Sequence, residues 1–297
     1  MTFKDFILEG VYGHFCVPSA SGGTYAFLYG LGLLLCTLTY FLGSLNFSII
    51  VSHVLYHDDI RRYGSGNAGS TNMLRIYGRR AAAFTFLGDA LKAVLSCLFG
   101  YFMMGYIGAC IAGFFCILGH IFPIYYHFRG GKGIVTVAFM VLMLDPVVFA
   151  ILFGFFLVIL VGSRIVSLAS IMCALLYPLV LYRIEGPGTP VVFAFLCTAL
   201  VVFMHRENMM RIFHGQESRI DFKALSRKGT PPVAEAKKAE GAATNDEGEG
   251  AGEASSAEAA PATPRPYDAS DYKKTSVSRA KQKRRREQAK QEKRNKA

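Results

Sequence analysis

The sequence predicts an all-α integral membrane protein with about seven transmembrane helices and a cytoplasmic tail. Three observations support this class. Hydrophobic residues make up 52% of the chain, which is typical of a membrane protein. They form long runs between residues 24 and 206 and become rare after Thr230. The basic residues, which give a formal net charge of +11, gather between these runs and in the tail.

Seven apolar segments are candidates for membrane helices. A helix of about 20 residues is needed to cross the roughly 30 Å hydrocarbon core of a bilayer. The segment at 134–144 is shorter than this and ends at Asp145-Pro146, a strong turn signal. The expected spans are residues 25–50, 81–103, 106–127, 134–144, 147–162, 165–182 and 190–205.

The arginines and lysines of the loops predict the orientation. If residues 134–144 cross the membrane, every basic loop except the one with Arg183 falls on one side, which the positive-inside rule identifies as the cytoplasm. The N-terminus is then outside and the C-terminus inside. An alternative merges residues 134–162 into one helix, but it would place the basic segment after residue 205 outside the cell. We therefore expect seven spans.

Composition divides the chain into three regions. Residues 1–23 form a lead-in without an obvious cleavable signal peptide, and residues 24–220 form the membrane domain. Residues 221–297 form a tail that is rich in Ala, Glu, Gly, Pro and Lys and has too little apolar surface to fold, so we expect it to be disordered.

The tail ends in the strongly basic run "SRAKQKRRREQAKQEKRNKA". We expect this run to lie on the anionic lipid of the cytoplasmic leaflet. Contact with RNA and a simple solvated tail are the alternatives. No aromatic interleaving or RNA-binding fold accompanies the basic run, so no specific nucleic acid is expected.

A first glycine-rich loop, "GSGNAGSTN" at residues 64–72, follows the first span. It matches the dinucleotide fingerprint as text, but no βαβ unit surrounds it, and it lacks the lysine of a P-loop. The feature that both motifs share is still present: glycines let backbone N–H groups approach an anion closely. Ser65, Asn67, Ser70, Thr71 and Asn72 add neutral donors, and Arg75, Arg79 and Arg80 add charge a few residues on. The alternative is a tight turn between helices.

Two more polar segments fall on the same predicted face. "FRGGKG" at residues 128–133 is a second glycine loop with Lys132 inside it and a helix after it, which suits a phosphate. "HRENMMR" at residues 205–211 places His205 and Asn208 on one side of a helix. A flexible linker and an interfacial helix end are the respective alternatives. Together the three segments favour an enzyme that joins a charged soluble molecule to a lipid.

Three of the longer segments resemble a known family. "YGSGNAGSTN", "GHIFPIYYHFRGGKG" and "HRENMMRIFHGQE" are similar, in order and spacing, to the signatures of the bacterial acyl-phosphate:glycerol-3-phosphate acyltransferases, the PlsY family. "LGSLNF", "LGDALKAVL" and "SRIVSLASI" resemble its other recurrent segments, so the resemblance covers about residues 25–220. Ser70, Asn46 and Ser48 stand where alanine, proline and glycine are usual, and none of these is a charged position.

The resemblance implies a seven-helix enzyme of the bacterial cell membrane with its site facing the cytoplasm. It would transfer a fatty acyl group from acyl phosphate to the 1-hydroxyl of glycerol 3-phosphate, giving lysophosphatidic acid and phosphate, the first committed step of phospholipid synthesis. No cofactor is implied. The expected partners are the two substrates, membrane lipid and the soluble enzyme that makes acyl phosphate.

The resemblance also assigns site residues by matching position. Those expected to contact glycerol 3-phosphate or its phosphate are Ser65, Arg75, Lys132, His205 and Asn208, with Ser65, Lys132 and His205 acting in catalysis. Those expected to shape the phosphate pocket are Asn67, Thr71, Asn72, Gly130, Gly131 and Gly133. The proton acceptor for the attacking hydroxyl is either His205 or a phosphate oxygen of a bound substrate, and the resemblance favours the second.

Other sequence features have simpler interpretations. The H-x-x-x-x-D pattern from His53 to Asp58 is typical of another acyltransferase class, but the glycerol-phosphate segment that accompanies it there is missing. No third metal ligand accompanies His53 and His57, so no metal site is expected. Asp89 and Lys92 are spaced to form an ion pair inside the second span, with a substrate contact as the alternative. An anion transporter is the rival function, although no inverted repeat is visible.

Overall fold

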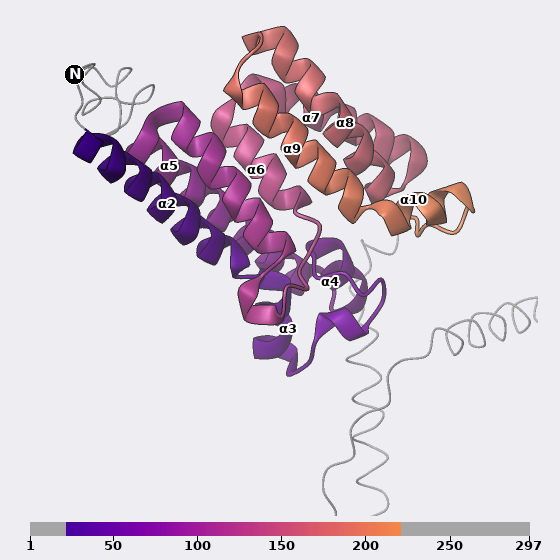
Figure 1. Cartoon of the computed structure of the whole chain (residues 1–297). Coiled ribbons are helices and arrows are strands. Elements are labelled where there is room, and N and C mark those ends of the chain that lie inside the picture. The colour runs from indigo at the N-terminus through magenta and orange to yellow at the C-terminus, as the bar shows by residue number, and fades with distance from the viewer. Residues whose placement is uncertain (1–21, 221–297) are drawn as a thin grey trace, which may run out of the picture. The chain divides into compact units, whose positions relative to one another are not determined.

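The structure of the protein is a computed structural model that describes residues 22–220, so the tail and nearly all of the lead-in lie outside the described residues. Within this range the chain is helical and contains no strand (Figure 1). The helices are α2 (Gly22–Ser44), α3 (Phe47–Tyr56), α4 (Ser70–Ile76), α5 (Arg79–Ile121), α6 (Ile134–Leu144), α7 (Pro146–Ser163), α8 (Val166–Glu185), α9 (Thr189–Met204) and α10 (Arg206–Phe213), with short 3₁₀ turns at η1 (Ile60–Arg62) and η2 (Ile124–Tyr126).

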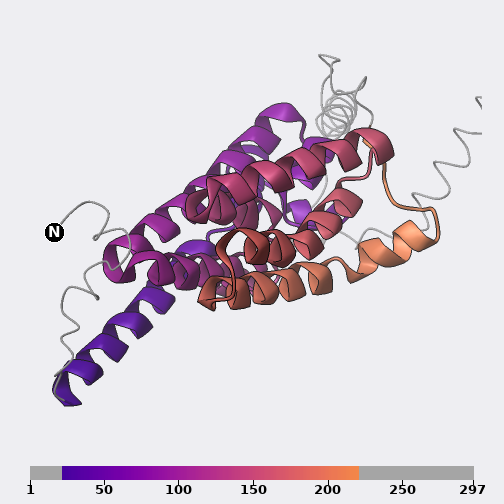
Figure 2. The same cartoon turned by 90° about the horizontal axis from the view of Figure 1, so that it is seen from above.

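The first predicted span, residues 25–50, overlaps the apolar stretch Tyr29–Tyr56, which is long enough to cross a membrane, but it is not one continuous helix. The helix breaks between α2 and α3, because Asn46 has an extended backbone and its side-chain oxygen accepts a hydrogen bond from Ile49 N, the position of a helix N-cap. Figure 2 shows the start of α2 extending away from the other helices, and Tyr29 and Leu33 on it are 77% and 70% exposed. Apolar side chains exposed to this degree are suited to contact with lipid.

Helix α5 is a hairpin of two apolar arms. Met104 and Gly105 interrupt it, with Gly105 at φ +61°, a conformation that glycine adopts without strain. The arms pack so closely that a Cβ added to Gly100 would overlap the carbonyl of Gly108. The predicted spans 81–103 and 106–127 therefore correspond to the two arms, except that the second arm ends at Ile121, ahead of Pro123.

The short helix α6 matches its predicted range, and it is separate from α7. Asp145 between them has an extended backbone, and its carboxylate accepts hydrogen bonds from Val147 N (2.8 Å) and Val148 N (3.0 Å). Pro146 follows as the first residue of α7, where its missing N–H has no cost. These contacts exclude the alternative in which residues 134–162 form one helix.

Length and apolar composition make most of these helices suitable for a membrane. Four stretches of the described residues are long and apolar enough to cross a bilayer, and one of them contains both arms of α5. Helices α9 and α10 form a further candidate that is bent by 57°. The four stretches are Tyr29–Tyr56, Arg79–Tyr126, Pro146–Ser163 and Val166–Glu185.

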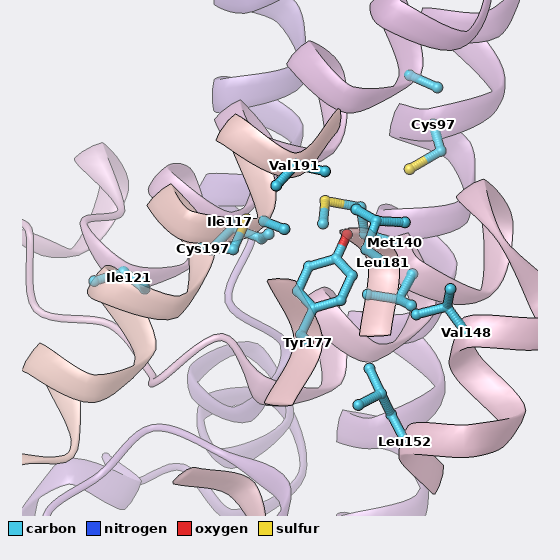
Figure 3. Packing of buried hydrophobic residues seen from close by; sticks show 13 residues of the cluster. Cys97, Ile117, Ile121, Met140, Val148, Leu152, Tyr177, Leu181, Val191 and Cys197 are labelled. Atoms are coloured by element: carbon cyan, nitrogen blue, oxygen red, sulfur yellow. The ribbon is translucent and has the colours of Figure 1, made fainter. Parts of the chain in front are cut away.

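The main core joins α5 to the four helices that follow it. Figure 3 shows Met140 of α6 near Tyr177 of α8, with Val148 of α7 and Val191 of α9 in the same cluster. Cys97 and Cys197 are fully buried in it as free thiols, where a cysteine behaves as a small apolar side chain. A second, smaller core joins α3, η1, α4 and the start of α5, and it positions the first glycine loop.

Candidate active site

The first glycine loop is held in shape by one buried side chain, Asn72. Its oxygen accepts a hydrogen bond from Ser65 N (3.1 Å), and its nitrogen donates to Tyr63 O (3.0 Å) and Asn67 O (3.1 Å). Gly64 and Gly66 both have positive φ, at +61° and +69°, so the tight path requires glycine. Asn72 was predicted to shape the pocket, and its bonds to the loop backbone are of that kind.

The second glycine loop lies against the end of α5. Gly130 N donates to Ile121 O (3.1 Å) and Gly131 N donates to His120 O (3.2 Å), so the loop satisfies carbonyls that the helix end leaves open. A Cβ added to Gly130 would overlap His120 O. Gly133 has φ +75° and caps the start of α6. The three predicted glycines are therefore required by close approach or by backbone conformation.

The two glycine loops contact each other directly. A Cβ on Gly131 would overlap both Ala68 O of the first loop and the His120 ring. Arg61 Nη1 donates to Tyr126 O (3.2 Å) and Arg129 O (3.1 Å), while the rest of its guanidinium binds Asp59. Backbone contacts and one arginine thus join two segments that lie more than 50 residues apart.

The third polar segment reaches the second glycine loop through Lys132. The Lys132 ammonium donates to the side-chain oxygen of Asn208 on α10. The nitrogen of Asn208 donates to Glu217 (2.6 Å), which also accepts hydrogen bonds from Ser167 Oγ (2.8 Å) and Arg211 Nε (2.8 Å). The bend between α9 and α10 aims Asn208 at the loop, so all three predicted segments meet.

Burial changes the acidity of the charged groups here. Burial, followed by the nearby charge of Arg211, lowers the pKa of Lys132 to about 8, while Glu217 acts in the opposite direction. Burial favours a raised pKa for Glu217, but the hydrogen bonds from Arg211, Asn208 and Ser167 outweigh it and lower that pKa. The site therefore contains an ammonium group that loses its proton more readily than a free lysine and a carboxylate that keeps its charge to lower pH than a free glutamate.

His205 lies at the bend itself. Its Nδ1 is 2.8 Å from Val201 O, and since a carbonyl only accepts, the hydrogen is on Nδ1. In the neutral ring Nε2 is then the acceptor. The side chain is buried, with 3% of the residue exposed. A neutral His205 can accept a hydrogen bond from a substrate hydroxyl.

The other predicted contact residues are more exposed. Ser65 lies on the first loop, and Thr71 and Arg75 lie on α4, all three exposed and therefore accessible to a soluble molecule. Asn67 is half-buried beneath them. The structure brings the two glycine loops, Lys132 and Asn208 into contact, and it leaves Ser65 and Arg75 exposed.

Two groups were not assigned a role from the sequence. Glu217 belongs to the third motif, but the sequence does not show that its carboxylate binds both Asn208 and Ser167. His120 supports Gly131 from below, and no local pattern indicates this.

Asp89 and Lys92 form the predicted ion pair, with Lys92 Nζ 2.9 Å from Asp89 Oδ1 and each residue at most 2% exposed.

Comparison with known proteins places the site in a family context. The family model for glycerol-3-phosphate acyltransferase matches residues 33–215, a range that contains both glycine loops, Lys132, His205 and Asn208. The chain is 42% identical over 190 residues to the glycerol-3-phosphate acyltransferase of Syntrophomonas wolfei, which covers 64% of this chain and 97% of that protein. It is 37% identical over 191 residues to that of Finegoldia magna, covering 63% and 96%.

A solved structure shares the arrangement of the helices. The crystal structure of PlsY (YgiH), an integral membrane glycerol 3-phosphate acyltransferase in its glycerol 3-phosphate form, superposes with a TM-score of 0.63 at 32% identity. The match covers 66% of this chain and 99% of that one. The lysophosphatidic acid form of the same protein gives a TM-score of 0.60.

Proposed function

The chain belongs to the glycerol-3-phosphate acyltransferase family, and we propose that it uses acyl phosphate as the acyl donor. It acylates the 1-hydroxyl of glycerol 3-phosphate and releases lysophosphatidic acid and inorganic phosphate. One observation carries the site assignment. Lys132 belongs to the second glycine loop, which contacts the first one, and its ammonium group bonds to Asn208 on α10. Cationic and amide groups thus surround one place at which phosphoryl groups can bind.

The chemistry needs positioning more than a covalent nucleophile. Acyl phosphate is a mixed anhydride, so its phosphate is already a good leaving group. The hydroxyl oxygen of glycerol 3-phosphate attacks the acyl carbon, the carbon–oxygen bond to phosphate breaks, and the hydroxyl proton is transferred to a base. Both substrates are anionic, so the enzyme must hold them together and stabilise the departing phosphate.

The site residues divide this work. Lys132, with Arg75, neutralises the phosphoryl groups, and the Ser65 hydroxyl donates a hydrogen bond to one of them. Backbone N–H groups beside the glycines add further donors. Asn208 holds Lys132 in place and offers its amide to the glycerol phosphate. Fixed dipoles and charges of this kind lower the energy of a transition state in which charge moves to the leaving phosphate.

We favour a phosphate oxygen of a bound substrate as the proton acceptor. His205 Nε2 then accepts a hydrogen bond from a glycerol hydroxyl and orients it. If so, His205→Gln, whose amide oxygen also accepts, raises the KM for glycerol 3-phosphate and keeps most of kcat. Loss of kcat with an unchanged KM would identify His205 as the base.

The remaining proposal concerns placement in the cell. Seven spans, an outer N-terminus and an inner C-terminus put both glycine loops and α10 on the cytoplasmic side of the bacterial cell membrane. There they can receive acyl phosphate from the soluble enzyme that makes it, and the basic tail can lie on anionic lipid. Topology reporters at Asn72, Gly131 and Asn208 test this proposal, and reporters on opposite sides of the membrane would contradict it.

A donor assay tests the function. Purified protein in lipid is given labelled glycerol 3-phosphate with acyl phosphate, acyl-CoA or acyl carrier protein, and lysophosphatidic acid is measured. We expect product with acyl phosphate alone. Product with only acyl-CoA or acyl carrier protein would overturn the donor assignment. Uptake of glycerol 3-phosphate into sealed vesicles without any product would instead support the transporter.

A further inference from the structure

A buried polar cluster lies beneath the second glycine loop, outside the predicted site. It consists of Asp89 and Lys92 on the first arm of α5 and His120 near the end of the second arm. The three residues are between 1% and 3% exposed. A buried charged cluster is a weak source of stability, because desolvation offsets most of the attraction between the charges. The contacts of the cluster with the end of α2 and with Gly131 therefore favour a role in positioning these segments.

Lys92 is bound on one side to the break in the first span. The end of α2 leaves backbone carbonyls without helical partners, and the Lys92 ammonium donates to Gly43 O (2.9 Å) and Leu45 O (2.8 Å). An ammonium group has three hydrogens, and two are used here. These bonds fix the ammonium group relative to α2, while the Asp89 carboxylate at 2.9 Å balances its charge.

The third hydrogen of Lys92 is directed to His120. Nζ lies 2.8 Å from His120 Nδ1, so the ring nitrogen accepts the bond and the ring cannot turn freely. The opposite side of the ring, at Nε2, lies so close to Gly131 that a Cβ there would overlap it. The backbone carbonyl of His120 also binds Gly131 N at 3.2 Å.

We propose that Lys92 and His120 are positioning residues for acyl transfer. They link the break between α2 and α3 to Gly131 and so set the position of the adjacent Lys132. The cluster is buried beneath the loop and acts through the loop backbone. The inference deepens the proposed function and rests on it for the role of Lys132. A displacement of about 1 Å in a positioning group can reduce a rate by about a hundredfold.

Two substitutions of the same residue separate positioning from space filling. His120→Asn places an amide oxygen where Nδ1 lies and can still accept from Lys92, whereas His120→Leu fills similar volume without an acceptor. We expect Leu to lower kcat/KM for glycerol 3-phosphate at least about tenfold and Asn to stay within about threefold of the wild type. Equal behaviour of Asn and Leu, both active or both impaired, would overturn the proposal.

Lys92→Met tests the other end of the same link. If both residues act along one path, Lys92→Met and His120→Leu have similar effects, and the double variant is no worse than the more severe single variant. Losses that multiply in the double variant would show two independent roles and would contradict the link. Thermal unfolding of each purified variant shows whether it remains folded, and the His120 pair decides the matter if Lys92→Met does not fold.

Amide hydrogen exchange gives a measurement that does not depend on turnover. In His120→Leu, and not in His120→Asn, peptides covering residues 128–133 should exchange at least about tenfold faster, while the Gly186–Gly188 connection is unchanged. Unchanged exchange at 128–133 in His120→Leu would refute the inference. The wild-type donor assay is done first, so an inactive wild type with the expected exchange pattern would count against the proposed function alone.

Discussion

The two contacts that assemble the site are made in different ways. The first and second glycine loops meet by close backbone approach, with Gly131 against Ala68 O, and the Arg61 side chain adds hydrogen bonds to the carbonyls of residues 126 and 129. The contact between the second loop and α10 is made by side chains, from Lys132 to Asn208 and on to Glu217. The first contact has little freedom to change, whereas the second can be altered by titration or by a single substitution. We call the contact between the two glycine loops the rigid half of the site, and the contact between Lys132 and α10 the adjustable half.

The largest effect is expected from removing the Lys132 side chain, which joins the second glycine loop to α10. Lys132→Ala removes the charge that we propose neutralises phosphate and takes away the donor that bonds to Asn208, so kcat/KM should fall about a hundredfold or more. Initial rates at varied glycerol 3-phosphate measure this. Arg183→Ala, at an exposed position in the last turn of α8, is the matched control and should stay close to the wild type. A Lys132→Ala enzyme with near-normal rates would remove the site assignment.

The rigid half is tested by adding one methyl group. Gly131→Ala inserts a Cβ that overlaps Ala68 O and the His120 ring, so the loops must separate, and kcat/KM should fall at least about tenfold. Gly154→Ala is the control, since a Cβ on Gly154 of α7 meets nothing within 4 Å. If both variants kept full activity, the backbone contact between the loops would not matter for function.

The adjustable half should be sensitive to pH. In the proposed function the Lys132 ammonium is the form that would bind phosphate, and its pKa of about 8 lies below the usual value. Activity at low glycerol 3-phosphate should therefore decline as the pH rises through about 8, because the charged form is lost. A pH profile of kcat/KM for the free enzyme measures this decline.

Glu217→Gln sharpens the same test. Glu217 is the first carboxylate that opposes the lowering of the Lys132 pKa, so removing its charge should move the alkaline decline to lower pH. We expect a shift of under about one pH unit, because Glu217 acts on the Lys132 pKa less than burial and Arg211 do. A decline that moved to higher pH would show that another group is titrating.

The smallest effect is expected outside both halves. Deletion of residues 231–297 should leave turnover within about twofold of the wild type, because the tail is too polar to contribute to a packed core. Rates measured in the same lipid mixture for both proteins test this. A truncated protein that folds but has no activity would show that the tail takes part in the reaction.

The positions of most helices can be predicted from the order of residues along the chain. The apolar runs predicted α6, α7, α8 and α9 closely, because hydropathy depends on neighbouring residues along the chain. Asp145-Pro146 also signalled a break from local chemistry, a capping carboxylate followed by a residue without an N–H. The three motifs indicated that the polar segments belong to one site, and the structure brings these segments into contact.

The side-chain contacts between the three polar segments could not be predicted without the three-dimensional fold. The approach of Glu217 to Asn208 and the placement of His120 beneath Gly131 join residues through the packing of separate helices. None of these contacts has a periodic signal, since each depends on the 57° bend after α9 or on the pairing of the two arms of α5. Local sequence specifies where helices begin and end, and close approach between helices specifies which polar groups meet.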